Sequence, residues 1–330
     1  MNKIAIFGLS RSGKTHYINA MAKLMQGGVS IDSSPSSVIN MFASIEQQHK
    51  IDENVGIILK QRKWLDGTQG LAISDEGTQN SIQYDDRLSL TLDTEIICNN
   101  ILQPYFNPQF KLYDYRGGVW EDNNDANKKG RKILLKEFKD ALVLMLFVDG
   151  EKLLNAMDNA DLDPSHRRSD TSIKLEALNS IMIMNNIYRE YYECNNRKPP
   201  VLVVITKSDL FKNEQVDELW KAKEFIIKKF SSIFCEGSGC DSAITWVSLG
   251  TNLQNTNQQS MALPATGRIE ITTKHNLHIP MLYSLLAYID SIFDYDKPED
   301  EQETVDNVLS LLQLMLKDGI IMYNDGHIQF

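Results

Sequence analysis

Two glycines near the N-terminus, Gly8 and Gly13, frame a loop that ends in Lys14 and Thr15. The full stretch is Gly8, Leu9, Ser10, Arg11, Ser12, Gly13, Lys14 and Thr15. Glycine lets a backbone curl so that several N–H groups converge on one anion, and the start of a helix adds partial positive charge there. The apolar residues 3–7 before the loop favour a strand, and the residues after it repeat apolar positions at helical spacing. The pattern predicts a phosphate-binding loop in which Lys14 reaches the β- and γ-phosphates and Thr15 binds Mg²⁺.

The composition is that of an ordinary globular chain. Its 330 residues are 42% hydrophobic, which suffices for a large core, and its net charge of −10 argues against a basic face for nucleic acid. Four scattered cysteines do not make a disulfide framework. Because the first strand begins at Lys3, we expect no signal peptide, no membrane insertion and a cytoplasmic location.

An insertion is expected over about residues 31–63. Ser34 and Pro35 resemble the cap and first turn of a helix that would continue through Val38 to Ile45. A glycine-punctuated, polar loop follows, up to a strand that alternates from Arg87 onward. This segment is therefore predicted to be helical and then irregular.

Further along, two acidic motifs follow predicted strands. The strand at 110–113 ends at Asp114, where a carboxylate can hold Mg²⁺ through water, and Gly117 can turn its N–H toward a γ-phosphate. The apolar strand at 201–205 ends in Thr206-Lys207-Ser208-Asp209. A carboxylate at position 209 can accept hydrogen bonds from the N1–H and amine of guanine, while the Lys207 stem covers the base. After the next strand, Ser248 and Leu249 offer backbone N–H groups to the base oxygen.

The C-terminal part changes in composition. A polar linker is predicted at about 251–266, and an acidic run near residue 294 marks a boundary between a main domain, 1–293, and a small segment, 294–330. A helix at 304–316 and a hairpin around Asn324-Asp325-Gly326 are expected in this segment, which is too small for a core of its own.

Together these motifs resemble those of the Ras-like, translation-factor-related class of P-loop GTPases. Gly8–Thr15 is similar to the phosphate loop, Asp114–Gly117 to the Mg²⁺ and γ-phosphate sensor, Thr206–Asp209 to the guanine reader, and Ser248–Gly250 to the fifth motif. The resemblance is nearest to uncharacterised bacterial GTPase-like families with a Gly-Leu-Ser-Arg-x-Gly-Lys-Thr loop. It implies an α/β fold of three layers with a mostly parallel central sheet, and binding of GTP or GDP with Mg²⁺.

The resemblance leaves the switch threonine open. This class carries a threonine in the mobile loop before the second strand, which closes on the metal. Thr68 resembles the residue in the bacterial relatives, whereas Thr78 better suits Ras-like spacing. Either residue is a candidate metal ligand.

Catalysis is the second open point. Many relatives carry a water-orienting glutamine where this chain has Gly118. Arg11 stands where guanylate-binding proteins and atlastins carry an internal arginine finger, and Arg116, Glu121 and Asp122 are further candidates for the missing role. The leading hypothesis is a slow GTPase switch that is stimulated by a protein partner or by nucleotide-dependent dimerisation. A GTP-bound scaffold with negligible hydrolysis and a P-loop ATPase or small-molecule kinase are the alternatives.

Overall fold

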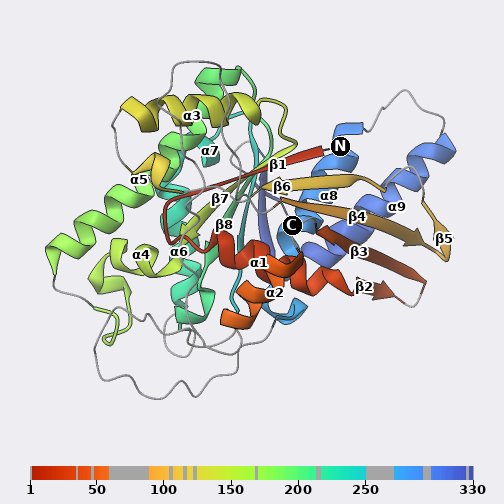
Figure 1. The fold of residues 1–330 in the computed structure, drawn as a ribbon, viewed down its shortest axis with the longest axis horizontal. Coiled ribbons are helices and arrows are strands. Elements are labelled where there is room, and N and C mark those ends of the chain that lie inside the picture. Colours follow the sequence, from red (N-terminus) through yellow and green to blue (C-terminus); the bar gives the residue numbers. More distant parts are fainter. Residues whose placement is uncertain are drawn as a thin grey trace.

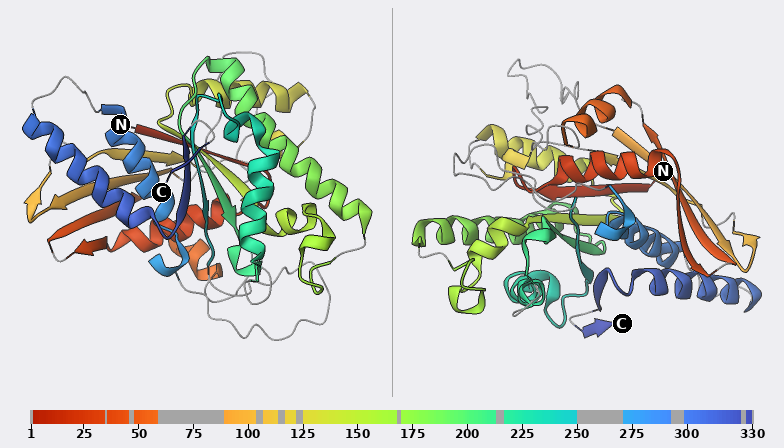
Figure 2. Two further views of the ribbon diagram at one scale, coloured as in Figure 1. Left: turned by 180° about the vertical axis from the view of Figure 1, so that it is seen from behind. Right: turned by 90° about the horizontal axis from the view of Figure 1, so that it is seen from below.

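The computed structural model describes most of the chain. The described residues are 2–34, 36–45, 48–58, 89–103, 107–113, 117–121, 125–167, 170–212, 217–249, 271–292, 299–324 and 327–329. They form one eleven-stranded sheet in the order β11-β10-β9-β8-β7-β1-β6-β4-β3-β2, with β5 paired to β4. Helices lie on both sides of this sheet (Figures 1 and 2). The predicted α/β class is confirmed.

The centre of the sheet is parallel. It consists of β6 (Gln109–Tyr113), β1 (Asn2–Gly8), β7 (Val143–Asp149), β8 (Val201–Thr206) and β9 (Asp241–Trp246). All four neighbouring pairs run parallel, and β7 and β8 are buried along their whole length. A strand covered on both faces favours apolar residues, which explains the apolar runs that lead up to Asp149 and Thr206. The carboxyl ends of these strands meet at one edge.

The flanks of the sheet are antiparallel. On one side β4 (Ser89–Cys98) pairs with β6, followed by β3 (Ser37–Ile45) and β2 (Val29–Ser34), with β5 (Ile101–Leu102) on β4. On the other side β10 (Ile320–Asn324) pairs with β9, and β11 (His327–Gln329) with β10. The expected mostly parallel arrangement therefore holds for the central five strands.

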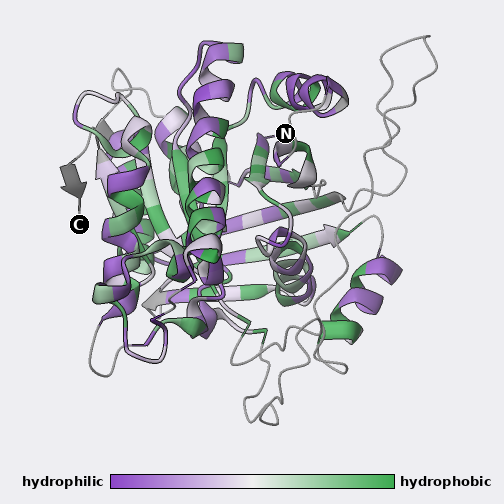
Figure 3. Ribbon diagram, turned by 90° about the vertical axis from the view of Figure 1, so that its left-hand side faces the viewer, coloured by the Kyte–Doolittle hydropathy of each residue, from purple (hydrophilic) through white to green (hydrophobic). Residues whose placement is uncertain are grey.

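Alternate residues of β1 enter two different cores. Ile4 and Ile6 belong to the core under α1 (Lys14–Gln26), α8 (Ile279–Ile292) and α9 (Glu299–Leu316). Ala5 and Phe7 belong to the opposite core, under α3 (Asp125–Glu137), α4 (Gly150–Ala156), α5 (Thr171–Asn195), α6 (Glu218–Lys229) and α7 (Ser231–Phe234). The helices carry hydrophobic and hydrophilic residues in alternation (Figure 3), as expected of helices that bury one face. The fold thus has the three layers that the sequence predicts.

The predicted inserted helix is wrong for residues 38–45. These residues form β3, which pairs with both β2 and β4. Ile39 and Met41 are buried on one side of it and Phe42 is exposed on the other, a period of two that the helical interpretation overlooked. The helix of this insertion comes later, as α2 (Gln48–Gly56).

The C-terminal segment joins the main sheet. Its helix and hairpin occur where the sequence predicts them, but β10 extends the sheet beyond β9, and residues of α9 such as Val308 and Leu312 share a core with Ile4. Before α8, Thr273–His275 form a 3-10 turn. The predicted linker at about 251–266 lies outside the described part of the chain.

Candidate phosphate-binding site

The loop after β1 curls around the ammonium group of Lys14. Gly13 caps α1 with φ +87°, and Arg11 also adopts a left-handed conformation, φ +64°. Lys14 is buried and its Nζ donates hydrogen bonds to the carbonyls of Gly8 and Leu9, both at 2.8 Å, and to Ser12 Oγ at 3.3 Å. The ammonium is therefore held inside the curl of the loop, where the N-terminus of α1 adds to its positive potential.

Thr206, at the end of β8, fixes the far side of the loop. Its Oγ1 lies within hydrogen-bond distance of the carbonyls of Ser12, at 2.9 Å, and Val148, at 3.2 Å. A Cβ on Gly13 would lie only 3.1 to 3.2 Å from the Thr206 side chain. The first residue of the predicted guanine reader thus directly contacts the loop that is predicted to bind phosphate.

Gly117 lies against the backbone of Leu9 and Ser10 in the loop. A Cβ at this position would come within 2.4 to 2.6 Å of the backbone of Leu9 and Ser10, so no other residue fits without moving the loop. Gly117 begins the 3-10 turn Gly117–Trp120, and Glu121 directly after it accepts a hydrogen bond from the Ser10 N–H at 2.7 Å. Glu121, one of several open candidates in the sequence, is therefore a neighbour of the loop.

Lys207 is held by two carboxylates. Its Nζ lies 2.9 Å from Asp149 and 3.4 Å from Glu151, and its backbone adopts the left-handed conformation, φ +53°. Asp149 ends β7 and also caps α4 by accepting from the Glu151 N–H at 2.9 Å. Sequence reasoning missed Asp149 as a partner of Lys207, although Asp149 ends β7 and Lys207 directly follows the neighbouring parallel strand β8.

The segments that follow β8 and β9 meet where the sequence predicts that a guanine base binds. Asp209 is exposed in the 3-10 turn Ser208–Leu210, and the Ser208 N–H donates to the carbonyl of Val247 at 3.2 Å. The Ser248 N–H donates to the carbonyl of His275 at 3.3 Å. This hydrogen bond engages the N–H that was expected to meet the base oxygen, while Leu249 is buried.

His16 lies behind the loop as a neutral imidazole. It follows Thr15 in the first turn of α1 and is 7% exposed. Burial, and secondarily the charge of Lys207, lower the pKa of His16 to about 3. This side chain therefore adds no charge to the site near neutral pH.

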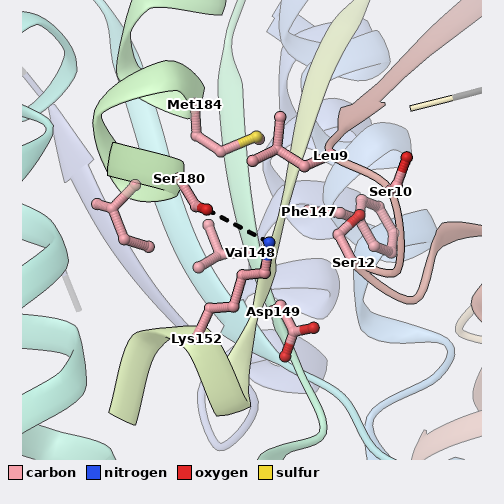
Figure 4. A pocket seen from close by; sticks show the side chains of 10 residues that line it. Leu9, Ser10, Ser12, Phe147, Val148, Asp149, Lys152, Ser180 and Met184 are labelled. Atoms are coloured by element: carbon pink, nitrogen blue, oxygen red, sulfur yellow. Dashed lines mark hydrogen bonds between the residues drawn. The ribbon is translucent and has the colours of Figure 1, made fainter. Parts of the chain in front are cut away.

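A narrow cleft borders the outer wall of the loop. Leu9, Ser10 and Ser12 line it from the loop, and Asp149, Lys152 and Ser180 are among the residues that line it from β7, α4 and α5 (Figure 4). Lys152 Nζ donates to Ser180 Oγ at 3.3 Å. The free volume is about 10 Å³, room for about one water molecule.

Several predicted site residues lie outside the described part of the chain. These are Thr68, Thr78, Asp114, Arg116, Asp122 and Gly250. Thr15 is at the start of α1 beside Lys14, and Arg11 is exposed in the loop. Among the residues that the structure describes, no group of three His, Cys, Asp or Glu side chains is placed to hold a metal ion.

Comparisons with known proteins add similarities of fold only. No family model matches the chain, and no curated protein matches it. It is similar to the crystal structure of an ADP-ribosylation factor-like GTP-binding protein, the small COPII coat GTPase SAR1 of Encephalitozoon cuniculi in complex with GDP, with 13% identity and a TM-score of 0.31 over 80% of this chain and 74% of that one. It is also similar to the G domain of the T. maritima FeoB iron transporter, with 13% identity and a TM-score of 0.26 over 75% of this chain and 87% of that one. At such TM-scores the residues of the site decide what it binds. Separately, none of the described helices combines the length and apolarity needed to cross a membrane.

Proposed function

We propose that this chain is a GTP-binding switch that hydrolyses GTP slowly to GDP and phosphate with Mg²⁺. The observation that carries the proposal is the hydrogen bond between Thr206 and Ser12 at 2.9 Å. It joins the segment predicted to read guanine to the loop predicted to hold phosphates, so one nucleotide can span both. The four carbonyl partners of Lys14 and Thr206 give this junction a fixed geometry.

Each part of the nucleotide has a candidate partner. The phosphates take the backbone N–H groups of the loop and the ammonium of Lys14. Guanine takes the carboxylate of Asp209, which rejects adenine because the carboxylate would then face no donors. Mg²⁺ takes the hydroxyl of Thr15 and phosphate oxygens, with Asp114 and either Thr68 or Thr78 as further candidate ligands.

Hydrolysis requires a cationic side chain that stabilises the negative charge on the transferred phosphoryl group. Arg11 is exposed at the tip of the loop, and no polar partner of its guanidinium is found among the described residues. A protein partner or a second copy of the chain would fold this side chain over the phosphates. An arginine in that role contributes about 10³-fold or more in rate.

A GTP-bound scaffold with negligible turnover is the second candidate function. Gly118 favours it, because this position has no side chain that could orient an attacking water. Single-turnover hydrolysis with wild type and Arg11→Ala separates the two functions. The switch predicts measurable turnover that rises with protein concentration or partner and falls in R11A, whereas the scaffold predicts no turnover in either protein.

Nucleotide identity tests the proposal as a whole. We expect purified protein to retain a guanine nucleotide, and we expect titrations to show a clear preference for GTP over ATP. Asp209→Asn should lower GTP affinity about 100-fold, because it removes a charged acceptor from two donors. Asp140→Asn, an exposed carboxylate at the other end of the strands, is the matched control. Equal affinities of wild type for ATP and GTP would overturn the guanine assignment.

A further inference from the structure

The segment from Gly117 to Glu121 is fixed onto the phosphate loop by buried side chains. Val119 and Trp120 are 4% and 2% exposed. The indole of Trp120 packs edge-on against Phe7, with 5.6 Å between ring centroids, and Phe7 lies at the end of β1 directly before the loop. Together with the close approach of Gly117 to Leu9, these contacts set the position from which the Glu121 side chain extends.

The carboxylate of Glu121 is an anionic ligand of this loop. Its Oε1 accepts from the Ser10 N–H at 2.7 Å, a short distance that is typical of a charge-assisted hydrogen bond. Within the described ranges no basic side chain forms an ion pair with this carboxylate, and the side chain is exposed. The Ser10 N–H holds it against the loop, and the anchored turn sets where its backbone lies.

A phosphoryl group and this carboxylate compete for the same hydrogen-bond donor. Both are anionic acceptors, whereas the Ser10 N–H has a single proton to donate. Two unit charges about 4 Å apart also repel each other by an amount that corresponds to at least tenfold in affinity, even where the surroundings are partly polar. A phosphate that approaches the Ser10 N–H must therefore displace the carboxylate.

We propose that Glu121 competes with the terminal phosphate of a bound nucleoside triphosphate for the Ser10 N–H, and so sets the preference of this site between di- and triphosphate. The inference rests on the proposed function, because it assumes that a guanine nucleotide occupies the loop. When the third phosphate displaces Glu121, the adjoining turn at 117–120 loses the hydrogen bond of Glu121 to the loop and therefore responds to the triphosphate. Glu121 is thus a specificity-determining residue for phosphate number.

Nucleotide titration tests this inference. GDP and a non-hydrolysable GTP analogue are each titrated against wild type, Glu121→Gln, Glu121→Ala and Glu193→Gln, an exposed glutamate of α5 that serves as the charge control. We expect E121A to bind the triphosphate about tenfold more tightly than wild type does, with a change of less than about threefold for GDP. E121Q should show the same direction with a smaller effect, since its amide oxygen can still accept from Ser10. E193Q should change neither affinity.

A second readout follows the turn itself. The chain has four tryptophans, so replacing Trp64, Trp220 and Trp246 by phenylalanine leaves Trp120 as the only indole emitter. Its fluorescence should change with the triphosphate analogue and little with GDP. In the E121A background the two nucleotides should give similar signals.

The outcomes separate this inference from the proposed function. If wild type binds both nucleotides and E121A alters both affinities equally, or neither, Glu121 does not select for phosphate number and the inference is overturned alone. If wild type binds no guanine nucleotide, the proposed function is overturned and the inference with it.

Discussion

Thr206 and Ser12 stand 194 positions apart in the sequence and are joined by a hydrogen bond of 2.9 Å between the threonine hydroxyl and the serine carbonyl. The same hydroxyl is 3.2 Å from the carbonyl of Val148, so it bridges the loop after β1 and the ends of β7 and β8. A threonine that ends a parallel strand is well placed for this role, because its neighbours end at the same edge. The loop is therefore fastened to the sheet at both of its ends.

Replacing Thr206 by valine should loosen the loop. Valine keeps the shape of threonine but leaves the two buried carbonyls without this donor, which costs about 1 to 2 kcal/mol in the free energy of unfolding. We also expect weaker nucleotide binding, since the loop is no longer held in one shape. Urea denaturation and nucleotide titration measure the two effects. Thr206→Ser retains the hydroxyl and should behave nearly as wild type in both.

Gly117 should tolerate no side chain. In Gly117→Ala the added methyl group would overlap the backbone of Leu9 and Ser10, so either the loop or the turn must move. Nucleotide affinity should fall at least about tenfold. Gly27→Ala is the control, because a Cβ at Gly27 meets nothing within 4 Å. Equal nucleotide affinity in both variants would mean that the close approach of Gly117 is unimportant for binding.

The sequence predicted the parts of this fold whose signals are local. The strand predicted at 201–205 follows from an apolar run that is buried on both faces, and β8 extends it by one residue, to Thr206. The prediction for the region of β3 is wrong, because its apolar residues fit the period of a helix as well as that of a strand. Pairing with the adjacent β2 and, above all, with the distant β4 makes this segment a strand.

The sequence indicates which segments meet at the candidate site, but not which side chains pair there. Residues at the ends of neighbouring parallel strands must meet, which brings Thr206 and Lys207 to the loop. The pairing of Lys207 with Asp149, and of Glu121 with Ser10, depends on backbone geometry at a left-handed residue and at a 3-10 turn. Such geometry leaves no periodic signal in a sequence.

Glu218 should be important for stability beside the predicted base-reading segment. Its carboxylate is fully buried at the start of α6 and accepts from the Asp163 N–H at 2.9 Å and the Lys212 N–H at 3.0 Å, with His166 Nδ1 at 2.9 Å. Glu218→Ala leaves these donors unpaired and should cost about 3 kcal/mol in the free energy of unfolding. Glu236→Ala, on an exposed turn, should cost little by the same denaturation assay. A similar small loss in E218A would show that water replaces the carboxylate.

His278 should make the protein less stable in mild acid. It is buried before α8, its Nδ1 has no hydrogen-bond partner among the described residues, and burial lowers its pKa from 6.5 to about 4. Between these two pKa values the unfolded chain binds a proton that the folded chain does not. The free energy of unfolding therefore falls as the pH drops from about 6.5 to about 4, by at most about 1.4 kcal/mol per pH unit. His16, whose pKa is lowered to about 3, acts in the same direction over a slightly wider range.

Denaturation at several pH values measures this dependence. His278→Leu replaces the imidazole by an apolar side chain of similar size that binds no proton. The share of His278 in the slope between pH 6.5 and 4 should therefore vanish, while that of His16 persists. His49→Gln, an exposed histidine of α2, is the matched control and should leave the slope of wild type unchanged. If H278L keeps the full wild-type slope, then the folded state admits the proton at His278, and burial of this imidazole does not limit stability in acid.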